Sequence, residues 1–212
     1  MNIRQFNRYI IYLISLFIIS LGASISIKAN LGTSPLICLP YVSSEIVKLS
    51  VGTVCFIFNF IFVFIQIILL RKDFEKRQLL QIIVGIVFSF FIDFSLSLIG
   101  FIHPVDYISQ LLVLFLSCIV CAFGVLLEIK TEVVYLPPDG AIVAISKILK
   151  KEFGKVKPFV DTTLVIISVS LSFIFLGYLT GVREGTVISA LIIGPLVRIL
   201  KKYLEKYIDA LI

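Results

Sequence analysis

The sequence predicts an all-α integral membrane protein with six transmembrane helices, arranged as two inverted three-helix repeats that each add a short re-entrant or interfacial helix. Three observations lead to this fold class. Of the 212 residues, 59% are hydrophobic and 15% are charged, whereas a soluble domain carries about 25% charged residues. Long stretches hold no charge, and distinctive residues recur 102 positions apart. The mean hydropathy of +1.12 also excludes a disordered chain.

The six predicted spans lie between clusters of charged residues. An α-helix rises about 1.5 Å per residue and needs about 20 apolar residues to cross a hydrocarbon core of about 30 Å. The stretches that meet or approach this length are 9–27, 49–70, 78–101, 107–127, 162–182 and 185–197. Asp93 interrupts the third stretch. The sixth is short, but the long side chain of Arg198 can extend from it to the headgroups.

Two further apolar segments, 35–49 and 137–151, are too short to span comfortably. Each begins with proline and carries a charged residue or two near its end. If both crossed the membrane, the basic loop 71–77 would fall on the outer side. We therefore expect each segment to be a re-entrant or interfacial helix, one on each side of the membrane.

The basic residues predict the orientation. With six spans and both termini in the cytoplasm, the inner segments hold 16 of the 19 Lys and Arg residues, and the outer segments hold only Lys28, Lys48 and Arg183. The opposite orientation would reverse this ratio and break the positive-inside rule. The net charge of +6 then faces anionic lipid. It does not indicate nucleic acid, because no basic patch interleaved with aromatic residues occurs.

An internal repeat divides the chain into residues 1–101 and residues 102–212, the second part ending in a short amphipathic tail. A shift of 102 residues superposes glycines, lysines and prolines, namely Gly22 on Gly124, Lys28 on Lys130, Pro35 on Pro137, Lys48 on Lys150 and Gly52 on Gly154. Each repeat holds three spans. Because three is odd, the two halves enter the membrane from opposite sides, as in the inverted repeats of many transporters.

These residues also carry a resemblance to a known family. The stretch GASISIKANLGTSP at 22–35, with SVGT at 50–53, resembles the first half of the YczE/YyaS/YitT family of bacterial membrane proteins. PPDG at 137–140, GT at 185–186 and GP at 194–195 resemble its second half. The similarity covers nearly the whole chain and is nearest to the YczE branch. It implies a multi-pass protein of the bacterial inner membrane. Charged positions of the family's fifth span are represented here only by Lys157 and Asp161.

Two loops that break helices are the first candidate site. They are 28–35, with Asn30, Gly32 and Thr33, and 130–140, with Asp139. Non-helical backbone at membrane depth persists only where protein or a wet cavity satisfies its polar groups. Such breaks at equivalent places in two halves therefore indicate a substrate or coupling-ion site. The alternative is an ordinary turn before an amphipathic helix.

Polar residues within the spans are the second candidate. A carboxylate at the centre of a span costs about 2.5–3.5 kcal/mol on insertion scales and needs a partner or water. The residues concerned are Asn59, Asp93, Glu128 and Asp161. Their functional interpretation is ion or proton coupling, and the alternative is a structural ion pair or an interfacial carboxylate.

Depth along the spans predicts two ion pairs. Lys28 closes the first span at a depth that Asp93 can reach, and Glu128 closes the fourth span near the depth of Arg198. Pairing would offset part of the cost of burying these charges. The two pairs would act as outer and inner gates of a site at the midplane, or as plain structural salt bridges.

We therefore expect a small secondary transporter or permease-like protein of the bacterial inner membrane. The alternative is an accessory or regulatory membrane protein that acts through a protein partner. No catalytic constellation, cofactor motif or metal-ligand cluster is evident, so we expect neither an enzyme nor a cofactor or metal. The expected partners are the lipid bilayer and a small molecule or ion. The sequence allows a homodimer without requiring one.

Overall fold

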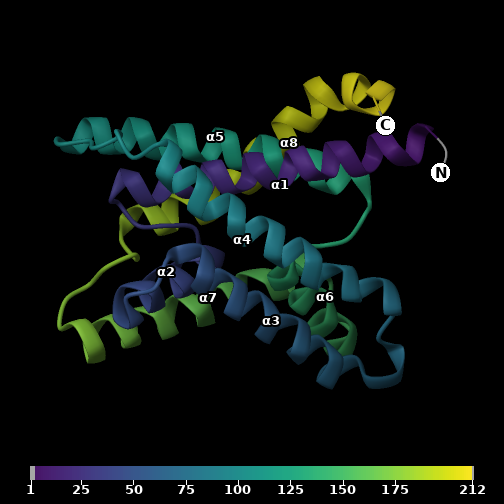
Figure 1. The fold of residues 1–212 in the computed structure, drawn as a ribbon, viewed down its shortest axis with the longest axis horizontal. Helices are drawn as coiled ribbons and strands as arrows, with labels where there is room; N and C mark the ends of the chain where they lie inside the picture. Colours follow the sequence, from purple (N-terminus) through teal and green to yellow (C-terminus); the bar gives the residue numbers. More distant parts are fainter. Residues whose placement is uncertain (1–2, 212) are drawn as a thin grey trace. The chain divides into compact units, whose positions relative to one another are not determined.

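The computed structural model describes residues 3–211 and contains helices and loops, with no strand in this range. Its eight α-helices appear in Figure 1. In chain order they are α1 (Ile3–Ala29), α2 (Pro35–Val47), α3 (Val51–Leu70), α4 (Leu80–Leu98), α5 (Tyr107–Thr131), α6 (Pro137–Leu149), α7 (Phe153–Leu171) and α8 (Glu184–Leu211). Two short 3-10 helices, η1 (Arg71–Asp73) and η2 (Lys76–Leu79), precede α4, and a short π-helix, η3 (Ser172–Leu176), follows α7.

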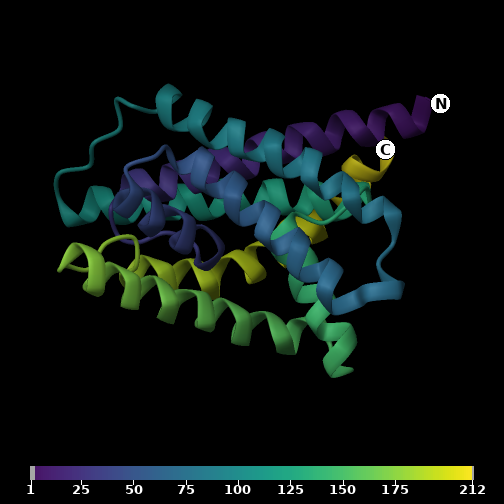
Figure 2. The same cartoon turned by 60° about the horizontal axis from the view of Figure 1, so that its bottom comes forward.

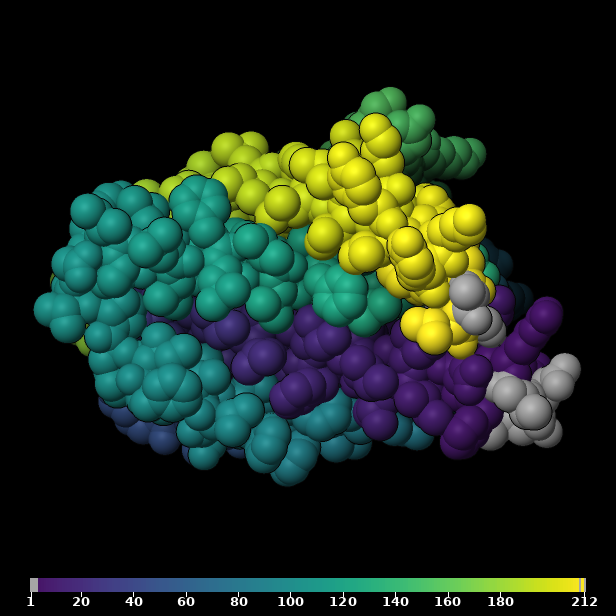
Figure 3. Space-filling view, turned by 90° about the horizontal axis from the view of Figure 1, so that it is seen from above, coloured from purple at the N-terminus to yellow at the C-terminus, as the bar shows by residue number. Residues whose placement is uncertain are grey.

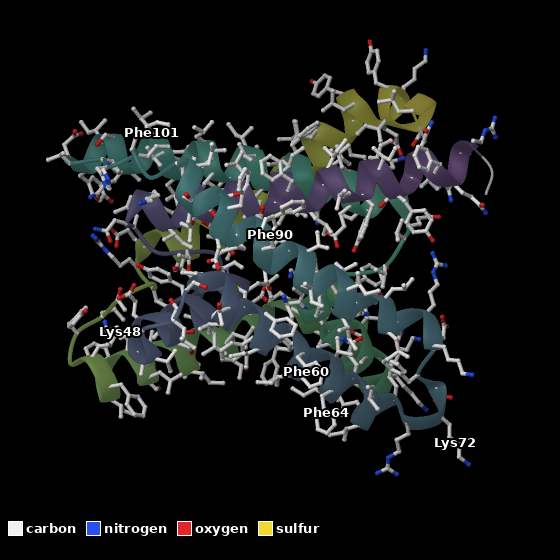
Figure 4. The ribbon with its side chains drawn as sticks, in the orientation of Figure 1. Lys48, Phe60, Phe64, Lys72, Phe90 and Phe101 are labelled. Carbon is white, nitrogen blue, oxygen red and sulfur yellow. The ribbon has the colours of Figure 1, made fainter. Side chains whose placement is uncertain are left out.

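Five of the helices are long and apolar enough to cross a membrane. With the adjoining turns they cover Arg4–Ala29, Val51–Asp73, Lys76–Leu98, Tyr107–Thr131 and Phe153–Leu176. Large apolar side chains cover their outer surfaces, and Figure 4 shows Phe60, Phe64 and Phe90 pointing away from the ribbon. A water-soluble protein rarely exposes so much contiguous apolar surface. The chain is therefore a helical membrane protein.

Two predicted spans belong to helices with different ends. The fifth predicted span, 162–182, corresponds to a helix that begins at Phe153 and continues through η3 to Leu176 (Figure 2). The fourth, 107–127, continues to Thr131. The charged residues that bounded the predicted spans, Glu128 after the fourth and Asp161 before the fifth, both lie inside the helices. Reading spans as uncharged stretches therefore ended the fourth too early and began the fifth too late.

The sixth predicted span is part of a longer helix. The apolar stretch 185–197 lies at the start of α8, which has 28 residues and continues through a basic C-terminal part. Its 13 residues measure about 20 Å along the axis, short of a hydrocarbon core of about 30 Å. Accordingly α8 is not one of the five helices that qualify as spans.

The two short helices begin at the prolines from which they were predicted. Both α2 and α6 have 13 residues, starting at Pro35 and Pro137. Proline suits the first helical position because its fixed φ is already helical and no N–H is needed there. After the two helices, Lys48 and Lys150 adopt left-handed conformations with φ of 56° and 52°. These two residues are 102 positions apart, as are the two prolines.

The described helices pack in two compact units, and each unit takes segments from both halves of the sequence. Unit 1 comprises Met1–Ser34, Phe91–Val133 and Gly181–Ile212. Unit 2 comprises Pro35–Phe90 and Val134–Thr180. Helix α4 contributes its first part to unit 2 and its last part to unit 1.

In unit 1, α1 and α5 lie side by side and antiparallel (Figure 1). A Cβ atom on Gly22 would lie 2.5 Å from the Cys121 Sγ atom, and one on Gly124 would lie 2.9 Å from the Ile19 backbone N. Any larger residue at either position would push the helices apart, at a cost of about 1–3 kcal/mol. Position 22 thus meets 121 and position 19 meets 124, so the contacts are related by the offset of 102.

In unit 2, the same offset relates the residues of the core. The buried cluster consists of Leu39 on α2, Phe62 on α3, Ala141 on α6 and Leu164 on α7. Leu39 and Ala141 are 102 positions apart, and so are Phe62 and Leu164. Helix α2 packs on α7, and α3 packs on α6.

The C-terminal part of α8 lies against α5 and α1 within unit 1, as Figure 3 shows in yellow beside teal and purple. Ile208 is buried in a cluster with Leu126 and Leu127 of α5. Lys130 bridges α5 to α8 through ion pairs with Glu205 and with Asp209, the latter at 3.0 Å. The predicted amphipathic tail is therefore a docked continuation of α8.

Candidate functional site

The candidate site lies in unit 2, where three charged side chains meet between α6 and α7. We name Asp139, Lys157 and Asp161 the charged triad. Asp139 is in the first turn of α6, which Pro137 begins. Lys157 and Asp161 are one helical turn apart on α7, so they face the same side of that helix.

Lys157 binds the two carboxylates unequally. Its Nζ atom lies 2.9 Å from Asp139 Oδ1 and 3.8 Å from Asp161 Oδ2. The side chains of Lys157, Asp139 and Asp161 are 33%, 22% and 17% exposed, so all three are largely withdrawn from the surface. One ammonium group therefore serves two carboxylates, and the closer one receives the hydrogen bond.

Asp161 retains an unsatisfied oxygen. Its Oδ1 atom is buried and has no hydrogen-bond partner. A buried polar atom without a partner costs about 1–3 kcal/mol, and more when it is charged. Native structures carry few such atoms, and each calls for a cause, such as a bound ion, a water molecule or a catalytic role. The excess negative charge of the triad is thus concentrated on Asp161.

A pair of buried glutamines holds the start of α6 in place. Gln66 on α3 donates from Nε2 to Gln81 Oε1 at 2.8 Å and to the Pro137 carbonyl at 3.1 Å. Gln81, on α4, donates in return to Gln66 Oε1 at 3.2 Å. Gly140 leaves the necessary room, because a Cβ there would lie 2.7 Å from the Gln81 amide and 2.8 Å from that of Gln66. These contacts fix the turn from which Asp139 reaches Lys157.

Helix α2 brings a thiol to the same region. Cys38 lies within electrostatic range of Asp161, and its Sγ atom is 3.2 Å from Ser168 Oγ on α7. The thiol also donates to the Pro35 carbonyl at 2.9 Å. Cys38 is buried, so it helps to separate the Asp161 carboxylate from the surface.

The predicted site residues in unit 1 occupy a tightly closed loop. Gly32 has φ of +99°, and a Cβ there would lie 2.5 Å from Thr186 Oγ1. Thr33 donates from its backbone N to the Gly181 carbonyl at 2.9 Å, and Arg183 donates to the Asn30 carbonyl at 2.9 Å. Hydrogen bonds to the segment 181–186 thus satisfy much of this non-helical backbone.

The other predicted residues are spread over both units. Asn59, in unit 2, points to α4, where its amide is 3.4 Å from the Gly85 carbonyl and from Ser89 Oγ. In unit 1, Glu128 is buried, Lys28 and Asp93 are half-buried, and Arg198 is exposed. Pairing of Lys28 with Asp93 and of Glu128 with Arg198 stays a prediction.

The sequence reasoning missed the role of two lysines. It treated Lys157 and Lys130 as cytoplasmic charges of the positive-inside count, whereas both make ion pairs with two carboxylates. The spacing of Lys157 and Asp161, four residues apart on a helix, was an available signal. For Lys130, the signal was the recurrence of acids at 205 and 209 on a basic helix.

Comparison with known proteins places the chain in a family. The family described as "Family of unknown function (DUF6198)" matches residues 6–202, so the chain belongs to it. The chain is also 26% identical over 201 residues to "Uncharacterized protein YyaS" of Bacillus subtilis (strain 168). That match covers 94% of this chain and 95% of the relative. The predicted resemblance to a YyaS-like family is confirmed, and no solved structure matches.

Proposed function

We propose that the protein is a small secondary transporter of the bacterial inner membrane, built as two inverted repeats with six membrane-crossing helices. These are the five long apolar helices and α8, whose 28 residues exceed the about 20 needed to cross. The observation that carries this proposal is that positions 102 residues apart meet reciprocal partners. Gly22 faces Cys121, and Gly124 faces Ile19. Gln66 faces Gly140. Shifting both positions by 102 gives Ser168 and Cys38, which are also in contact.

Reciprocal contacts of this kind are expected about a two-fold axis. Take two residues i and j of the first half. If i contacts residue j + 102, the axis requires that j also contacts residue i + 102, and both sets of contacts above meet this requirement. Because α1 and α5 run antiparallel, an axis that exchanges them lies across the helices rather than along them. Across a membrane, such an axis lies in its plane, which is the arrangement of inverted-repeat transporters. The step from repeat architecture to transport is an analogy at the level of the fold.

The polar groups within the helices agree with this function. Short proline-initiated helices recur in both halves, and the charged triad lies beside one of them. In the proposal, Lys28 with Asp93 and Glu128 with Arg198 form the outer and inner gates. Asn30, Gly32 and Thr33 in unit 1, and Asn59 in unit 2, are candidate residues for binding a small molecule or ion.

The test of transport is electrical. Proteoliposomes adsorbed on a solid-supported membrane are challenged with a pH jump, amino acids, sugars, nucleosides and carboxylic acids, with empty liposomes as the control. We expect a protein-dependent current with at least one of these probes. No current with any of them, from protein that is folded in the same vesicles, would favour the accessory function instead.

The test of orientation uses single cysteines in a cysteine-free background. We expect a cysteine at Glu75 to react only with reagent on the cytoplasmic side and one at His103 only from outside. Labelling of position 75 but not of position 103 from outside would overturn the proposed topology.

A further inference from the structure

The charged triad carries one negative charge more than the cations that the described residues bring to Asp161. The charged groups that act on Asp161 are Lys157, on its own helix, and Asp139, on α6. Helix α2 faces it with the Cys38 thiol, which carries no charge in its protonated form. One ammonium group and two carboxylates sum to −1 in a region where the carboxylates are about four-fifths buried. A charge in that position is costly until a cation joins it.

The groups around Asp161 are better suited to bind a proton than a metal ion. Hard metal cations need about six oxygen ligands. Among the described residues, no group of three or more His, Cys, Asp or Glu side chains is placed to hold a metal ion. Lys157 presents only donors. A proton, by contrast, needs a single lone pair, and the buried Oδ1 atom of Asp161 supplies one.

The geometry points to Asp161 as the binding site of one exchangeable proton, with Lys157 as the residue that positions it. The proton comes from water or buffer, adds to a lone pair of Oδ1 and forms an O–H bond, without any redox change. Asp161 is then neutral, and Lys157 with Asp139 remains as a balanced ion pair at 2.9 Å. This inference rests on the proposed transport function, in which the proton is the coupling ion.

The helix between the two side chains can respond to this change. Pro158 lies between Lys157 and Asp161 inside α7 and has no N–H to bond the carbonyl four residues earlier. Loss of the Asp161 charge removes its attraction for Lys157. Lys157 then forms an ion pair with Asp139 on α6 alone. Proton binding therefore shifts the strength of the link between α6 and α7.

The test is infrared difference spectroscopy of the reconstituted protein during pH steps. A protonated carboxyl group gives a carbonyl stretch that a carboxylate lacks. We expect wild type to show a reversible band that disappears in Asp161→Asn and persists in Asp209→Asn. Asp209 is a matched control because it shares Lys130 with a second carboxylate but is 54% exposed. A band that is unchanged by Asp161→Asn would overturn the inference.

Two additions keep the result interpretable. Asp161→Glu retains a carboxyl group and should keep a shifted band, even if Asp161→Asn folds poorly. The pH-jump current of the same vesicles separates the two proposals. An Asp161-dependent band without any current leaves the proton site standing and refutes transport. A wild-type current that Asp161→Asn leaves intact refutes the proton site and leaves transport standing.

Discussion

Each compact unit contains one lysine that binds two carboxylates, but the two clusters differ in their access to water. In unit 1, Lys130 binds Glu205 and Asp209, whose side chains are 41% and 54% exposed. In unit 2, Lys157 binds Asp139 and Asp161, which are 22% and 17% exposed. Lys201 also lies 3.8 Å from Glu205, so the charges of the first cluster balance, whereas the second keeps a surplus negative charge and an unsatisfied oxygen on Asp161. A lysine between two carboxylates therefore docks a helix in unit 1 and forms part of a candidate proton site in unit 2.

The largest expected effect separates the two lysines. Lys157→Met leaves two largely buried carboxylates without a cation, and we expect it to destabilise the protein by about 3 kcal/mol. This is the lower end of the range for breaking a buried pair, because Lys157 is one-third exposed. The matched variant Lys130→Met should cost clearly less, since water can solvate Glu205 and Asp209.

Thermal unfolding in detergent measures this difference. A thiol-reactive dye reports unfolding, because Cys38, Cys55, Cys118 and Cys121 are all free and buried. Equal losses for the two lysine variants would show that burial does not distinguish the clusters.

The second prediction concerns the turn that presents Asp139. Gly140→Ala places a Cβ against the Gln66 and Gln81 amides and should cost about 2 kcal/mol through overpacking. In the dye assay, Gly154→Ala on α7 is the control, because no atom lies within 4 Å of its added Cβ. We expect that variant to stay within about 0.5 kcal/mol of wild type. A wild-type melting temperature for Gly140→Ala would mean that the glutamine pair does not hold α6.

A smaller effect is expected from salt, which weakens an ion pair more when its side chains are exposed to water. Raising NaCl from 0.1 M to 1 M shortens the screening length from about 10 Å to about 3 Å. The melting-temperature difference between wild type and Asp209→Asn should therefore shrink, because the Asp209 side chain is 54% exposed. The difference between wild type and Lys157→Met should change little. If salt reduces both differences alike, water reaches the triad as freely as it reaches Lys130.

The smallest expected effect concerns Asp106, a solvent-exposed carboxylate that serves as a reference for the buried ones. Asp106 lies before α5, outside the spanning segments, and accepts a hydrogen bond at Oδ2 from the Ser109 backbone N–H at 2.9 Å. That bond holds the pKa of Asp106 below its ordinary value of 3.8. Its stabilisation is therefore present above pH about 4 and is lost as pH falls through the lower native value.

Asp106→Asn keeps a capping side chain but does not titrate. We expect its melting temperature to fall slightly less than that of wild type between about pH 6 and about pH 3. An identical fall in both proteins would show that the cap does not contribute to the pH dependence.

Much of the fold follows from local sequence signals. Pro35 and Pro137 begin the two short helices as predicted, since proline suits the first turn of a helix wherever it packs. Uncharged apolar runs locate the five long helices, because a bilayer core tolerates little else. The end of α5 and the start of α7 could not be predicted in this way, because both helices continue past charged residues, Glu128 and Asp161.

The sequence by itself determined the membrane character, the helical class and the family resemblance, because these depend on composition, run length and local motifs. It also named Asp139 and Asp161 as candidates, from their positions in a helix break and a span. Only the tertiary structure decided that these two carboxylates share Lys157, and that the Asp161 Oδ1 atom is left without a partner. Such a cluster joins residues 18 to 22 positions apart on two helices, and the packing of α6 against α7 creates it. The charge balance of a site depends on which side chains meet, and that is fixed by packing rather than by order along the chain.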